Sequence, residues 1–134
     1  FFSTDVLLVG EPGASYTDSS TATKYDNTGR VTAFKRATSA DPLTFLQDLR
    51  SPDKFSTAQL KFGSGIVVDD HTAVIATQYD GSAVGGATTH HNHLWVFVAN
   101  MDYTQWSAVH RIDDTSSDTN NVYFGSNNDL TPAM

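Results

Sequence analysis

Short apolar runs separated by polar turns recur along this chain. Residues 66–68 and 73–76 are apolar, mostly β-branched, and flank a tight polar turn, which is the pattern of a β-hairpin. Residues 6–9 form a continuous apolar run that ends at a turn rich in glycine and proline, as a buried strand does. Residues 30–35 alternate polar and apolar side chains, which predicts a half-buried strand. The pattern therefore predicts an all-β chain.

Residues 93–98 and 106–112 predict two further strands, whereas residues 41–50 fit two interpretations. An Asp-Pro pair and three leucines at helical spacing favour a short helix over 41–50. The same stretch, however, takes the place in the first half of the chain that residues 106–112 take in the second half. That later run alternates and carries no helix cap. We therefore interpret residues 44–49 as a strand as well.

The sequence also repeats itself. Phe62-Gly63-Ser64 returns 62 residues later as Phe124-Gly125-Ser126, residues 5–10 resemble 72–77, and residues 29–34 resemble 92–97. Self-similarity of this period is typical of repeat architectures. The predicted order is three strands, then four strands, then the start of another unit.

The predicted loops divide into two classes. Because consecutive antiparallel strands place alternate loops at opposite edges, the long polar loops 11–28, 51–61, 78–92 and 113–122 share one edge, and only short turns lie at the other. Long loops on one side indicate a recognition face or, equally, solvated spacers. The candidates for ligand contact are three tyrosines in or beside these loops and one acid: Tyr16, Tyr25, Tyr79 and Asp80.

Composition narrows the choice of partners. The formal net charge is −7, and eight Lys and Arg residues among fifteen acids form no basic stripe, which argues against nucleic acid. No apolar run approaches the roughly 18 residues of a membrane span, so we expect no membrane insertion. There is no cysteine. Abundant Ser, Thr, Asn, Asp and Gly with little Lys suit an extracellular or cell-surface protein.

Metal binding is a minor alternative to an expectation of no cofactor. His91 and His93 share one face of an extended segment and offer nitrogen ligands to zinc or another transition metal. Asp113, Asp114 and Asp118, with Asn120 and Asn121, offer oxygen ligands to calcium, but they lack the glycine and terminal glutamate of an EF-hand loop. No nucleophile motif, phosphate loop or paired carboxylate is recognisable, so we expect no enzymatic activity.

Taken in order, these motifs resemble FG-GAP repeats, the blade unit of the integrin-α-type β-propeller. The resemblance is carried by residues 62–76 for the first hairpin, by 6–13 for the Gly-Ala-Pro strand end and by 29–34 for the third strand. It implies antiparallel β-propeller-type blades in the short, calcium-free form, because the turn at 69–72 is too short to surround an ion. The implied units are 1–61 (strands two to four), 62–122, and 123–134 as the first strand of a following blade.

Two blades cannot close a propeller, which usually needs about 4 to 8. We therefore expect a circularly permuted arrangement in which the strand at Phe124 and Gly125 of one copy pairs with Val6, Leu7 and Leu8 of a neighbour, in a ring or a filament. The expected function is that of a non-enzymatic extracellular structural or adhesive module. The alternative is a carbohydrate-binding lectin on the same blades. The expected partners are other copies of the chain, and a glycan or a surface protein.

Overall fold

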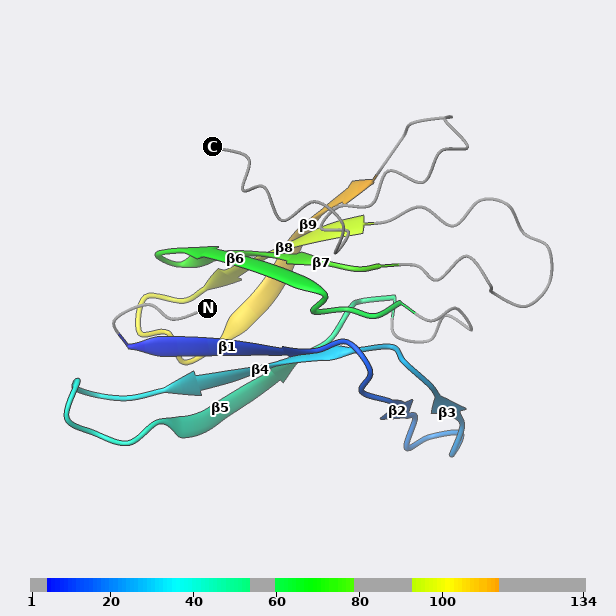
Figure 1. The fold of residues 1–134 in the computed structure, drawn as a ribbon, viewed down its shortest axis with the longest axis horizontal. Helices are drawn as coiled ribbons and strands as arrows, with labels where there is room; N and C mark the ends of the chain where they lie inside the picture. Colours follow the sequence, from blue (N-terminus) through cyan, green and yellow to red (C-terminus); the bar gives the residue numbers. More distant parts are fainter. Residues whose placement is uncertain (1–4, 54–59, 79–92, 114–134) are drawn as a thin grey trace.

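The structure is a computed structural model that describes residues 5–53, 60–78 and 93–113. Throughout these residues the chain is all-β, as the sequence predicts, and every pairing between its strands is antiparallel (Figure 1). No helix occurs in the described segments, so they contain none that is long and apolar enough to cross a membrane.

Two sheets make up the body of the molecule, and each follows the chain in order. The first is three-stranded, with β4 between β1 and β5; its strands are β1 (Val6–Glu11), β4 (Arg30–Lys35) and β5 (Thr44–Leu49). The second is a four-stranded meander of β6 (Gly65–Asp69), β7 (Thr72–Ala76), β8 (His93–Ala99) and β9 (Trp106–Asp113). The predicted order of three strands followed by four is confirmed, and residues 44–49 form a strand.

A small third element was not predicted. Within the polar stretch 11–28, β2 (Tyr16–Thr17) pairs with β3 (Lys24–Tyr25) as a two-stranded ribbon beyond the end of the first sheet (Figure 1). Strands this short carry no recognisable alternation of apolar and polar residues, so the sequence pattern gives no sign of them.

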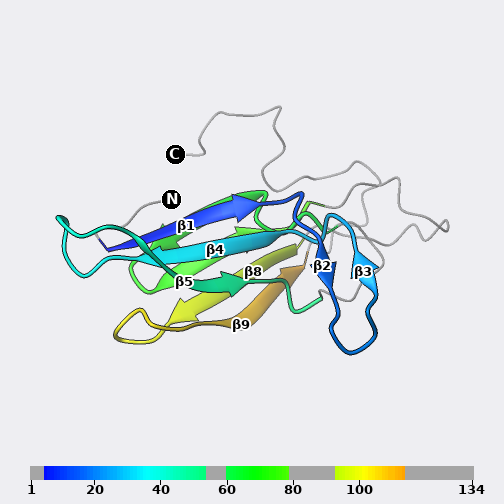
Figure 2. The same cartoon turned by 90° about the horizontal axis from the view of Figure 1, so that it is seen from below.

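The two sheets pack face to face around one core (Figure 2). Alternate residues of each strand point to opposite faces, so only one face of each sheet enters the core. The buried members are Val6, Leu8, Val31, Ala33 and Leu49 from the first sheet, and Phe62, Val68, Ala73, Ile75, Phe97, Ala99 and Trp106 from the second sheet and its flanking residues.

The two sheets share one pattern of pairing registers. In the first sheet Leu8 pairs with Ala33, and in the second Val74 pairs with Val96. Both hairpins that end the sheets contain a bulge at the same place: the register shifts between Ala33 and Phe34, and again 63 residues later between Val96 and Phe97. The structure therefore equates β1 with β7, β4 with β8 and β5 with β9.

This correspondence also corrects the repeat read from the sequence. The resemblance of residues 5–10 to 72–77 aligns Leu7 with Val74, but the registers align Leu8 with Val74. A shift of one residue moves every side chain of a strand to the other face. The corrected spacing for this strand is therefore 66 residues.

The two sheets pack head to tail, which means that the face of one sheet contacts the opposite, non-equivalent face of the other. Leu8 and Ala33 face the core from the first sheet, but their counterparts Val74 and Val96 point away from it. Two sheets that faced each other through equivalent surfaces would bury Val74 and Val96 instead. The sheets thus contact each other through non-equivalent faces, and such contacts do not close on themselves in pairs.

Backbones of the two halves come very close where the polar stretch 11–28 ends. Gly29 forms a parallel bridge with Phe62, and the amides of Lys61 and Phe62 donate to the carbonyl groups of Asn27 and Thr28 at 2.9 and 3.1 Å. A β-carbon on Gly29 would overlap the backbone of Phe62. Glycine is thus required here for close approach as well as for its φ of 79°.

Candidate functional site

The short turns of both sheets lie together at one end of the molecule. The Lys35 ammonium, at the end of β4, donates to the carbonyl group of Asp102 in the β8–β9 turn. The β6–β7 turn contacts the same β8–β9 turn through Asp70 and His71. For the turns that the structure describes, the predicted gathering at one edge is confirmed.

An aromatic and acidic cluster fastens these turns together. The Tyr103 hydroxyl donates to Oδ1 of Asp70, and the Tyr103 and His71 rings stack with centroids 4.0 Å apart. His71 Nδ1 lies 2.9 Å from Asp70 Oδ2, and His71 Nε2 lies 3.3 Å from the carbonyl oxygen of Met101. A doubly protonated imidazole donates to both acceptors, so this geometry favours the charged form of His71.

Titration of the cluster follows from these contacts. The hydrogen bond from Tyr103, with help from His71, lowers the pKa of Asp70 below its ordinary value. The Asp70 carboxylate and the Met101 carbonyl group raise the pKa of His71. The same carboxylate raises the pKa of Tyr103 to about 12, because ionisation of the phenol would break its hydrogen bond and place two negative charges together.

A cavity of about 580 Å³ opens beside this cluster, between the turn ends of the two sheets. Its lining includes Thr44 and Leu46 from β5, and Met101 and Tyr103 from the β8–β9 turn. Its charged lining residues are two cations and two carboxylates: Lys35, Arg36, Asp5 and Asp102. Opposite charges balance in the lining, so the cavity does not select anions or cations by net charge.

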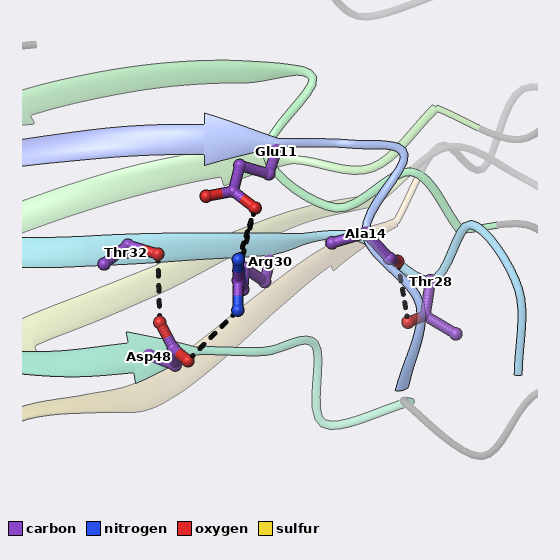
Figure 3. Close-up of polar contacts among 6 residues, drawn as sticks. All are labelled: Glu11, Ala14, Thr28, Arg30, Thr32 and Asp48. Atoms are coloured by element: carbon purple, nitrogen blue, oxygen red, sulfur yellow. Dashed lines mark hydrogen bonds and ion pairs between the residues drawn. The ribbon is translucent and has the colours of Figure 1, made fainter. Parts of the chain in front are cut away.

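A second polar cluster lies on the outer face of the first sheet (Figure 3). Glu11 Oε2 accepts from both Nε and Nη2 of Arg30, at 2.9 and 2.6 Å, and Arg30 Nη1 lies 3.5 Å from Asp48. Thr32 donates to the other Asp48 oxygen at 2.9 Å. These residues come from all three strands of the sheet, so the cluster ties the strands together at one end of this face.

Of the predicted ligand residues, the structure describes Tyr16 and Tyr25. They are direct partners in the β2–β3 ribbon, and the Arg50 guanidinium lies 5.0 Å from the centre of the Tyr16 ring. Figure 3 shows the base of this ribbon, where Thr28 donates to the Ala14 carbonyl group at 3.4 Å. Tyr79 and Asp80 lie outside the described residues.

The predicted assembly residues Val6, Leu7 and Leu8 belong to β1, which is the end strand of the first sheet in the described part of the chain. Its counterpart β7 lies inside the second sheet, between β6 and β8. The position that β6 takes in the second sheet thus has no counterpart among the described strands of the first. Phe124 and Gly125 lie outside the described residues.

Of the predicted metal ligands, His93 begins β8, and its backbone amide donates to the Thr77 hydroxyl at 2.9 Å. Asp113 ends β9, whereas His91, Asp114, Asp118, Asn120 and Asn121 lie outside the described residues. Across residues 5–53, 60–78 and 93–113, no group of three or more acidic or histidine side chains is arranged to hold a metal ion.

The turn cluster could not be predicted from the sequence. The turn cluster joins His71 to Tyr103, which are 32 residues apart, and the two rings carry no spacing motif that would link them. The sequence offered one indication that these two turns lie close together, namely the expectation that all short turns share one edge of the sheets. No family model, curated protein or solved structure matches this chain, so its function has to be inferred from its own geometry.

Proposed function

We propose that this chain is a non-enzymatic structural or adhesive repeat module of the FG-GAP propeller type, which acts outside the cell and assembles with copies of itself. The observation that carries the proposal is the repeat: two sheets with equivalent registers and equivalent bulges pack head to tail. Units that pack in this way extend into a ring or a filament rather than forming a closed pair.

Strand addition from another copy would fill the position in the first sheet that corresponds to β6 in the second. The second sheet begins with β6, which follows Phe62-Gly63-Ser64, and the triplet Phe124-Gly125-Ser126 repeats that motif near the end of the sequence. In the proposed assembly, the segment after Phe124 of one copy adds to β1 of the next copy. Main-chain hydrogen bonds give such strand addition its affinity.

The mass per particle of the native protein tests this proposal. Light scattering and negative-stain imaging should show particles of many copies, in rings or in filaments of constant width. Gly125→Pro removes a backbone donor from the added segment and should reduce assembly at least tenfold, whereas Ala133→Pro, beyond the motif, should not. A monodisperse monomer of the unmodified chain would overturn the proposal.

The β2–β3 ribbon favours a second function, carbohydrate binding. Tyr16 and Tyr25 are cross-strand partners, and with Arg50 near the Tyr16 ring they combine aromatic surface with hydrogen-bond donors. If the chain is a lectin, a glycan array should show binding that Tyr25→Ala abolishes and that Tyr103→Ala, at the opposite end, leaves intact. Loss with both variants would indicate unfolding rather than a sugar site, and circular dichroism separates these outcomes.

A further inference from the structure

The outer face of the second sheet is apolar although nothing in the described chain covers it. Val67, Val74 and Val96 are direct partners across β6, β7 and β8, so their side chains form one row on this face. Val67 is 64% exposed, and Val98 and Ile112 extend the apolar surface on the same face. The described titratable residues at positions on this face are Asp69 and His110.

The outer face of the first sheet is apolar over its half near the turns. Leu7, Phe34 and Phe45 are direct partners across the three strands, and Val9 lies beside them on the same face. The Phe34 and Phe45 rings meet edge to face with centroids 6.5 Å apart, and Phe45 is 64% exposed. The charged half of this face carries the Glu11, Arg30 and Asp48 cluster, in which one guanidinium serves both carboxylates.

Each outer face corresponds to a face that is already packed inside the molecule. The outward residues Val74, Val96 and Ile112 occupy the positions of Leu8, Ala33 and Leu49, which the first sheet buries against the second. Likewise, the outward residues Leu7, Val9 and Phe34 occupy the positions of Ala73, Ile75 and Phe97, which the second sheet buries against the first. The chain therefore exposes both halves of an interface that it also contains.

We propose that a second copy of this chain docks head to tail on the outer face of the second sheet, through the outer face of its own first sheet. Val67, Val74 and Val96 of one copy would contact Leu7, Phe34 and Phe45 of the next. A second copy fits better than an unrelated partner, because the chain itself carries the complementary face. The docking rests on the self-assembly proposed above, but it uses the sheet faces rather than an added strand and does not depend on strand exchange.

The internal interface also predicts one specific polar contact. Inside the chain, the Gln47 amide bonds the backbone of Trp106 across the two sheets. The registers equate Gln47 with His110, and the same 63-residue spacing equates Trp106 with Leu43. Docking in the same geometry places His110 of one copy beside the backbone of Leu43 in the next copy.

Cysteine cross-linking tests this placement cleanly, because the chain has no native cysteine. Leu43→Cys and His110→Cys proteins are prepared separately, mixed and oxidised. The mixture should form a covalent dimer at least tenfold faster than either variant alone, or than Leu43→Cys mixed with Met101→Cys. Equal cross-linking of His110→Cys with itself would mean that equivalent faces meet, and that result would overturn head-to-tail docking.

A mixing experiment tests the two faces independently. Val67→Lys and Phe45→Lys alter side chains that are both 64% exposed, so the fold should tolerate them, and each should weaken self-association at least tenfold in sedimentation velocity. In a Gly125→Pro background, which removes strand exchange, a mixture of the two retains one intact pair of faces and should form dimers but nothing larger. Met101→Lys, at 86% exposure in the β8–β9 turn, is the control and should assemble normally.

The outcomes also separate this contact from strand exchange. Gly125→Pro should leave the Leu43–His110 cross-link intact, because no added strand takes part in it. If Val67→Lys and Phe45→Lys assemble like the unmodified chain while Gly125→Pro does not, face docking is wrong and strand exchange stands. If the reverse holds, face docking stands and strand exchange is wrong.

Discussion

Gln47 of β5 holds both backbone groups of Trp106 at the start of β9. Gln47 Nε2 donates to the Trp106 carbonyl oxygen at 3.1 Å, and the Trp106 amide donates to Gln47 Oε1 at 2.9 Å. The Gln47 side-chain amide thus bonds the backbone of Trp106 as a neighbouring strand would, although β5 and β9 belong to different sheets. The Trp106 ring beside it is buried in the core, so this contact fixes the position of a large core side chain.

Replacing Gln47 should therefore loosen the contact between the sheets. We expect Gln47→Ala to lower the free energy of unfolding by about 2 kcal/mol, since each of the two neutral hydrogen bonds contributes about 1 kcal/mol. Urea unfolding followed by tryptophan fluorescence measures this change. Gln105→Ala, at an exposed position one residue before Trp106, should change stability by less than about 0.5 kcal/mol. Equal effects of the two variants would contradict the role given to Gln47.

Gly63 should not tolerate a side chain. Its φ is 91°, and a β-carbon there would lie 2.8 Å from the Arg30 carbonyl oxygen. We expect Gly63→Ala to cost about 3 kcal/mol, combining a left-handed backbone penalty of about 1–2 kcal/mol with overpacking. Gly13→Ala is the matched control, because its nearest neighbouring atom would be 3.9 Å away. Thermal unfolding of both variants compares them, and a Gly63→Ala protein as stable as Gly13→Ala would refute the close packing.

Thr77 should matter through its hydroxyl rather than its shape. The hydroxyl accepts from the His93 amide at 2.9 Å and lies 3.1 Å from the His93 carbonyl oxygen, and Thr77 is fully buried. Thr77→Val keeps the shape but leaves the His93 amide without this acceptor, which should cost about 2 kcal/mol. Hydrogen exchange of the His93 amide should accelerate as well. Thr72→Val, at the exposed first residue of β7, should neither lower stability by this amount nor accelerate exchange of the His93 amide.

The turn cluster should make stability depend on pH. The pKa of His71 is raised above 6.5, so its contribution is complete below that pH and is lost as the pH rises through the folded pKa. The pKa of Asp70 is lowered below 3.8, so its contribution is present above that pH and is lost on acidification. The cluster therefore stabilises the fold most between about pH 4 and pH 6.5.

Thermal melts at a series of pH values check this expectation, with NMR titration of the His71 ring. In Tyr103→Phe, which keeps the stacked ring but loses the donor to Asp70, the fall in melting temperature on acidification should shrink, because the folded pKa of Asp70 then lies closer to its unfolded value. In His71→Gln, the decline above pH 6.5 should shrink. A His71 pKa at or below 6.5 in the folded protein would contradict the geometry described.

Most main strands could be predicted from the sequence because they are short apolar or alternating runs bounded by polar turns. Arg30–Lys35 alternates clearly and forms β4 over the expected residues. At residues 44–49, helical leucine spacing competed with the repeat, and pairing of β5 with β4 decided the outcome. The two-residue strands at Tyr16 and Lys24 lie below the length at which alternation is recognisable.

The cross-sheet relationships could not be predicted in the same way. Which face of β1 enters the core depends on a single residue of register, and the sequence match between Leu7 and Val74 was off by that one residue. The Gln47–Trp106 contact spans 59 residues and involves a backbone, which carries no sequence signal. Contacts between segments far apart in the sequence could therefore be identified only from the structure.

The head-to-tail packing of the two sheets gives the unit a polarity. One outer face presents phenylalanines and a charged cluster of Glu11, Arg30 and Asp48, and the other presents a row of valines, so the two ends differ chemically. An array built from such units would grow at two distinguishable ends. A variant with only one intact face would then act as a cap, and its dose would set the length of the array.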